Sequence, residues 1–130
     1  MHFRIVAAFA AYCVLVGSPG ASTAQQVGDN EQACLRIGAN VAQRVEKLYR
    51  DSQVSQSRSW AAELIAVACG VSKRAVEKVS GMGCSSEVVE VMTGLYDHAR
   101  NTLITANAAR GEVLECSATD EQWDAALTND

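Results

Sequence analysis

Of the five cysteines in this 130-residue chain, Cys13 lies in the apolar N-terminal stretch, and the other four are widely spaced and limit the folds that are open to the chain. They are Cys34, Cys69, Cys84 and Cys116, and the gaps between successive members are 35, 15 and 32 positions. Metal sites and thiol-exchange motifs use cysteine pairs that lie two to four residues apart, so this spacing favours neither of them. An even number of distant cysteines in an exported chain predicts two structural disulfides.

The first 24 residues have the parts of a secretory signal peptide. Arg4 belongs to a short basic start, residues 5–16 are twelve uncharged and mostly apolar residues, and Ser22 and Ala24 offer small side chains for cleavage. Cleavage after Ala24 would leave 106 residues, 25–130, as a single helical domain. Twelve apolar residues fall short of the ~20 that cross a bilayer. We therefore expect a secreted or periplasmic protein without a stable membrane anchor after cleavage.

Apolar residues recur at intervals of three and four along the remaining chain, which is the period of amphipathic helices. Asp29, with Gln32 three residues later, predicts the start of the first helix, and residues 51–59 form its connection to the second. Ser57 or Ser59 is expected to cap that second helix. Its predicted buried side consists of Trp60, Leu64, Val67, Ala68 and Val71.

Glycines and small polar residues divide the second half of the sequence into further helices. Gly70 predicts a helix end, after which Ser72 would cap a short helix that stops at 81–83. Ser85 or Ser86 is expected to cap the strongest helix, which runs beyond position 101 until Gly111 breaks it. Thr119 and Gln122 have the spacing of a capping box for a last short helix. The pattern predicts an all-α bundle of four to five helices stapled by two disulfides.

The pairing of the four cysteines is open, because four cysteines allow three connectivities. We favour Cys34 with Cys116 and Cys69 with Cys84, since Cys69 ends one predicted helix and Cys84 precedes the cap of another. The second choice is Cys34 with Cys69 and Cys84 with Cys116, which would staple two helical hairpins.

The sequence offers little catalytic chemistry. His98 is the one histidine after the predicted signal peptide, and its neighbour Asp97 cannot orient it on a helix, because adjacent residues diverge by about 100°. The serines at 57, 59, 85 and 86 are better explained as helix caps than as nucleophiles, and no G-x-S-x-G elbow is present. We expect no enzyme, cofactor or metal, and keep a small hydrolase as a remote alternative.

Charge is distributed unevenly along the chain. The formal charge of −4 argues against nucleic-acid binding, which needs a concentrated surplus of Lys and Arg. Six acidic residues and no basic residue follow Gly111, which gives an acidic C-terminal tail. One interpretation is a solvated face, or pairing with the basic residues of the first half. The other is a docking patch for a basic partner, made by Trp123 with Asp120, Glu121 and Asp124.

Two functions follow from these patterns. The first is a non-enzymatic protein-interaction module, such as an inhibitor, an immunity-type protein or a chaperone-like protein, that recognises another exported protein. The alternative is a carrier that holds a small apolar ligand in a cavity between helices.

Overall fold

The computed structural model describes residues 22–128, with side chains from residue 28 onward. Four helices make up this part of the chain, and it contains no strand: α2 (Ser22–Val54), α3 (Arg58–Gly81), α4 (Ser86–Arg110) and α5 (Asp120–Thr128). The predicted small all-α bundle is confirmed. The predicted signal peptide falls outside the described residues except for its last three positions, and its cleavage stays a prediction.

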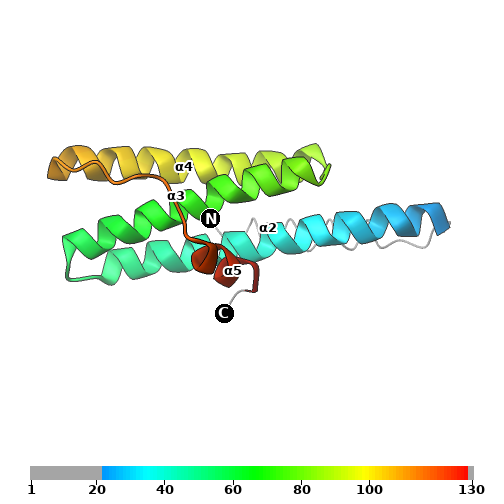
Figure 1. Ribbon diagram of the computed structural model, residues 1–130, viewed down its shortest axis with the longest axis horizontal. Helices are drawn as coiled ribbons and strands as arrows, with labels where there is room; N and C mark the ends of the chain where they lie inside the picture. The colour runs from blue at the N-terminus through cyan, green and yellow to red at the C-terminus, as the bar shows by residue number, and fades with distance from the viewer. Residues whose placement is uncertain (1–21, 129–130) are drawn as a thin grey trace.

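Helices α2, α3 and α4 run alternately up and down, with α3 making the main contacts to both of the others (Figure 1). The short helix α5 packs across α2 and α3. A segment without regular structure, residues 111–119, leads from the end of α4 back along α3 to α5, and is called the return segment below. No helix within residues 22–128 is both long and apolar enough to cross a bilayer.

Local capping signals fix most of the helix ends. Ser57 caps α3 by accepting a hydrogen bond from the Trp60 amide at 3.2 Å, and Ser85 accepts one from the Val88 amide at 3.5 Å at the start of α4. Gly111 ends α4 in the left-handed conformation, at φ 66°, which glycine adopts without steric cost. These predicted boundaries are confirmed.

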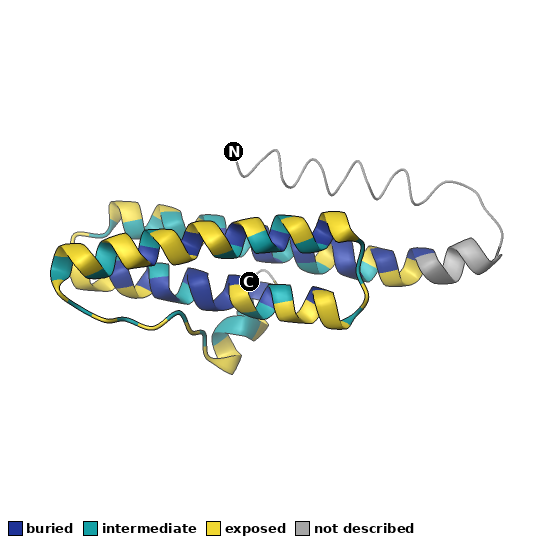
Figure 2. Ribbon diagram, turned by 90° about the horizontal axis from the view of Figure 1, so that it is seen from above, coloured by how far each residue is buried: buried dark blue, intermediate teal, exposed yellow. Residues whose placement is uncertain are grey.

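The core is built from small and medium-sized apolar side chains along one face of each long helix (Figure 2). Met92 at its centre is fully buried, as are several valines, among them Val41, Val45, Val71 and Val79. β-Branched residues lower helix propensity slightly, so tertiary packing rather than propensity holds these helices.

Two predicted helix boundaries are wrong. Helix α2 begins at Ser22 rather than at Asp29, and α3 continues through Gly70 to Gly81. Ser72 is therefore an interior helix residue, not a cap, and its hydroxyl donates to the Ala68 carbonyl at 2.8 Å.

Gly70 does not end a helix but allows another part of the chain to pass close to α3. A Cβ at this position would lie 2.1 Å from the Ser117 carbonyl carbon, so glycine lets the return segment cross directly over α3.

The disulfides follow the one connectivity that the sequence analysis did not favour. Cys34 pairs with Cys84 and Cys69 pairs with Cys116, with Cα–Cα distances of 5.7 and 5.1 Å. The expected Cys69–Cys84 bridge fails because α3 is continuous: about twelve helical residues after Cys69 carry the chain roughly 18 Å away, beyond disulfide reach. The two bridges interlace, since each loop encloses one cysteine of the other. All four cysteines are oxidised, which fits an oxidising compartment.

Candidate functional site

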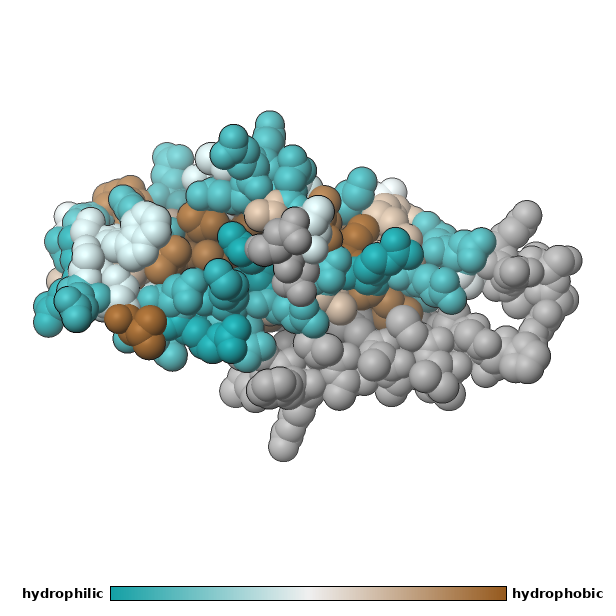
Figure 3. All heavy atoms as spheres, turned by 90° about the horizontal axis from the view of Figure 1, so that it is seen from below, coloured by the Kyte–Doolittle hydropathy of each residue, from teal (hydrophilic) through white to brown (hydrophobic). Residues whose placement is uncertain are grey.

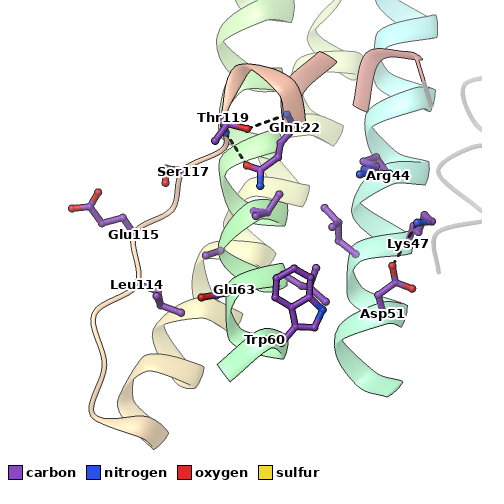
Figure 4. A pocket seen from close by; sticks show the side chains of 14 residues that line it. Arg44, Lys47, Asp51, Trp60, Glu63, Leu114, Glu115, Ser117, Thr119 and Gln122 are labelled. Carbon is purple, nitrogen blue, oxygen red and sulfur yellow. Dashed lines mark hydrogen bonds and ion pairs between the residues drawn. The ribbon is translucent and has the colours of Figure 1, made fainter. Parts of the chain in front are cut away.

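A groove of about 600 Å³ lies on the surface of α3 (Figure 4). The face of α3 forms its floor, α2 and the return segment form its two sides, and the beginning of α5 closes one end. The space-filling view from below shows apolar surface exposed among hydrophilic side chains (Figure 3). The apolar lining of the groove comes from Leu48, Leu64, Ala66, Val67 and Leu114.

The return segment is held in place at several points along its length. The Asn107 side chain donates to the Leu114 carbonyl at 3.0 Å and accepts from the Leu114 amide at 3.1 Å. The Cys69–Cys116 disulfide then fixes the segment to the middle of α3, directly before it crosses Gly70. Leu114 is thereby positioned as one side of the groove without belonging to a helix.

A capping box fixes the closed end of the groove. The Thr119 amide donates to the Gln122 side chain at 2.8 Å, and the Gln122 amide donates to the Thr119 hydroxyl at 3.1 Å. This predicted box is confirmed. Helix α5 is also anchored beyond it, since the Asn40 side chain donates to the Leu127 carbonyl at 2.6 Å and Ala126 is fully buried. The acidic C-terminal stretch is therefore largely a docked part of the fold.

Trp60 lies on the groove floor, in the first turn of α3 and in the gap toward α2 (Figure 4). The sequence analysis placed this side chain in the core, yet it is 55% exposed. Its position on the helix is correct, but the first turn of α3 extends beyond the end of the packed core. The Ser57 cap fixes the backbone from which the indole projects.

The charges around the groove are divided between its sides. On α2, Lys47 pairs with Asp51 at 3.6 Å, and Arg44 also has an interaction within the chain. Glu63 on the floor and Glu115 on the return segment are both exposed, and neither forms a salt bridge with another described residue. The α2 side of the groove thus carries both signs of charge, and the Glu115 carboxylate points away from the groove (Figure 4).

The residues of the predicted docking patch all lie on α5 and differ in their exposure. Trp123 is half-buried and packs against the main core. Asp120 pairs with Arg74 at 3.0 Å, in an exposed ion pair that links α5 to α3. Glu121 and Asp124 are exposed on α5. Trp60 is the more exposed of the two tryptophans, at 55%, and sequence spacing alone did not distinguish them.

His98 lies on a different face of the molecule. Its ring meets the ring of Tyr49 edge to face, with centroids 5.6 Å apart at 82°. Burial raises the pKa of Tyr49 to about 12, and a hydrogen bond with Thr102 acts in the opposite direction. This geometry is that of a packed aromatic pair. Among the described residues, no group of three or more His, Cys, Asp or Glu side chains is arranged to hold a metal ion.

Comparison with known proteins gives no further assignment: no family model, curated protein or solved structure matches this chain.

Proposed function

We propose that this protein is an exported, non-enzymatic interaction module that binds another exported protein through the α3 groove. The observation that carries the proposal is Trp60, a large aromatic side chain that is 55% exposed on the floor of an apolar groove. Buried tryptophans surrounded by a polar rim are the residues that dominate protein–protein binding energies.

The rigidity of the groove supports this proposal. One side is a long helix, and the other is a segment fixed by a disulfide and by two hydrogen bonds between the Asn107 side chain and the Leu114 backbone, one donated and one accepted by Asn107. A surface that is already in its binding conformation loses little conformational entropy on association.

The carrier hypothesis remains the second candidate, because a volume of about 600 Å³ lies within the range of small-molecule sites. The two hypotheses differ in what Trp60 would contact. A protein partner would cover the indole from outside, whereas a small apolar ligand would co-purify with the protein and be extracted by organic solvent.

Site-specific photocrosslinking tests the interaction function. A photoreactive residue at position 63, on the groove floor, should give a discrete protein adduct in the exporting host. Trp60→Ala should weaken binding of the captured partner by about thirtyfold, which corresponds to roughly 2 kcal/mol for an aromatic hot spot. The matched control is Ile104→Ala, because Ile104 is 54% exposed but does not line the groove.

The binding affinity of each variant is interpreted together with its folding stability, so that a loss of binding is not confused with a loss of structure. Both tested side chains are more than half exposed, so neither substitution should lower the unfolding midpoint by more than a few degrees. Equal binding by the Trp60→Ala and wild-type proteins would refute the groove as the contact surface. A small apolar molecule extracted from the wild-type protein, with no protein adduct, would favour the carrier instead.

A further inference from the structure

Neither disulfide joins two cysteines that follow one another in the folded part of the sequence. Cys34 pairs with Cys84 across 50 positions, and Cys69 pairs with Cys116 across 47 positions. The shortest loop that the four cysteines allow, between Cys69 and Cys84, spans only 15 positions and is not closed in the structure. The native pairing is therefore not the one that proximity along the chain favours.

Loop closure in the unfolded chain favours a different first bridge. The entropic cost of closing a loop rises with the logarithm of its length, so a loop of 15 residues closes about sixfold more often than one of 47 or 50. Closing Cys69 with Cys84 leaves Cys34 and Cys116 as the second pair. The unfolded chain is thus biased toward the connectivity that the sequence analysis favoured and the structure excludes.

The native bridges depend on packing that the short loop does not need. Cys116 lies on the return segment, none of whose residues is fully buried, and it reaches Cys69 only after α4 has packed along α3. Cys34 meets Cys84 only after α2 has packed against α3. Tertiary packing provides most of the stability of such helices. The Cys69–Cys84 loop can therefore close before the cysteines of either native pair have been brought together.

A chain with that loop closed cannot adopt the native bundle. Cys69 lies in the middle of α3, whereas Cys84 lies at its end, where the Cys84 amide donates to the Val79 carbonyl at 3.0 Å. The ten helical residues from Cys69 to Val79 span about 15 Å, and a disulfide joins Cα atoms within about 7 Å. The two native bridges lie at these two levels of α3. Every non-native pair would join one level to the other, so mispaired bridges must be exchanged before folding is complete.

We propose that the exported chain closes the Cys69–Cys84 loop first and reaches its native bridges as a substrate of a thiol–disulfide isomerase in the exporting compartment. The partner is identified by its chemistry, which is a reactive thiolate that attacks disulfides and leaves again. This inference rests on export but not on what the α3 groove binds.

The exchange needs no net oxidant or reductant. The isomerase thiolate attacks the Cys84 sulfur of the Cys69–Cys84 bridge, which forms a mixed disulfide and releases Cys69 as a thiolate. Cys69 then attacks the Cys116 sulfur of the Cys34–Cys116 bridge, which forms the native Cys69–Cys116 bridge and releases Cys34. Finally, Cys34 attacks the mixed disulfide at Cys84, which forms the second native bridge and regenerates the isomerase thiolate. Two disulfides are present before and after the sequence.

Oxidative refolding of residues 25–130 tests the order of bridge formation. The reduced chain is oxidised with diamide, which supplies no thiol, and samples are alkylated at intervals and mapped without reduction. Lysine or arginine lies between each two successive cysteines, so trypsin gives each cysteine its own peptide. In the first samples the Cys69–Cys84 peptide pair should exceed either native pair by about sixfold. A purified disulfide isomerase should then speed conversion to the native pairs by about tenfold or more.

Export from a bacterial host with and without its disulfide isomerase tests the partner. Loss of the isomerase should lower the yield of natively bridged wild-type protein by about threefold or more, because the short loop closes about sixfold more often than either native loop. The controls are C34S/C84S and C69S/C116S, each of which keeps one native pair and cannot mispair. The yield of each control should be the same in both hosts. Either control suffices if the other does not fold, and the refolding experiment needs neither.

The remaining outcomes overturn the proposal and leave the interaction function standing. Native bridges that form first in diamide would show that folding precedes pairing. An unchanged yield of wild-type protein without the isomerase would exclude the partner, and an equal loss of wild type and controls would show a general defect in export. None of these results alters the photocrosslink at position 63, which is measured on natively bridged protein. Loss of that crosslink alone would refute the groove and leave this inference unaffected.

Discussion

Replacing Gly70 with alanine tests the close crossing of the return segment over α3. A Cβ at position 70 would lie 2.1 Å from the Ser117 carbonyl carbon and 2.3 Å from the Ala118 amide nitrogen. Ordinary contact between carbon atoms begins at about 3.5 Å, so the return segment would have to move by about 1.4 Å. The neighbouring atoms are backbone, and Cys116 is fixed to α3 directly before the crossing, so the segment cannot yield by rotating a side chain.

Two opposing effects determine the magnitude. Alanine in a helix interior is favoured over glycine by about 1 kcal/mol, because it restricts the unfolded chain. Overpacking costs about 1–3 kcal/mol, and a clash with fixed backbone belongs at or above the upper end of that range. We therefore expect Gly70→Ala to lower the free energy of unfolding by about 2 kcal/mol, and the melting temperature by roughly 10 °C.

Gly94 provides the matched control, because it is exposed within α4 and an added Cβ would meet no atom within 4 Å. Gly94→Ala should raise the free energy of unfolding by about 0.5–1 kcal/mol. Urea unfolding followed by circular dichroism measures both variants. In a C69S/C116S background the return segment can move away, so the penalty of Gly70→Ala should fall by about 1 kcal/mol or more. Stabilisation by Gly70→Ala equal to that by Gly94→Ala would refute the reasoning.

Four further predictions concern the disulfides, α5 and Tyr49. Peptide mapping of the unreduced protein should recover the two cysteine pairs of the structure, and recovery of either other connectivity would contradict the fold. Truncation after Cys116 should lower the unfolding midpoint in urea, because it uncovers the site where Ala126 is fully buried; an unchanged midpoint would show that α5 is not docked. Thr119→Ala should cost about 1 kcal/mol in the same assay through loss of the capping box, and Thr119→Ser should restore most of it. Burial raises the pKa of Tyr49 from 10.0 to about 12, which favours the neutral phenol in the folded state; the associated stability should be complete below pH 10 and lost as the pH rises through 12. Ultraviolet titration of a Tyr96→Phe variant checks this value, and a midpoint near 10 would contradict it.

The sequence was sufficient for those features that depend on neighbouring residues. Ser57, Ser85 and Gly111 act on helix ends within one turn of themselves, and the Thr119–Gln122 box is a local pair. Helix periodicity likewise identified the buried positions Leu64, Ala68 and Val71 of α3, because it needs no knowledge of which helix packs on which.

The errors share a dependence on distant partners. A glycine at position 70 can either end a helix or leave room for another segment to cross the helix, and the sequence does not distinguish these two roles. The residue that crosses here, Ser117, is 47 positions further along the chain. Once α3 was divided at that point, Cys69 and Cys84 were placed together and the cysteine pairing was wrong. The groove was missed for the same reason, because Leu114 reaches the Trp60 face only through the fold of the return segment.

The interlaced disulfides also determine what a peptidase can do to this protein. A single cut anywhere between Cys34 and Cys116 leaves the two fragments joined by at least one sulfur bridge. Bridges within each helical hairpin would have let one cut in the exposed turn at 81–83 release the two halves. With the observed connectivity, a molecule that is cut once in this turn keeps both halves covalently joined.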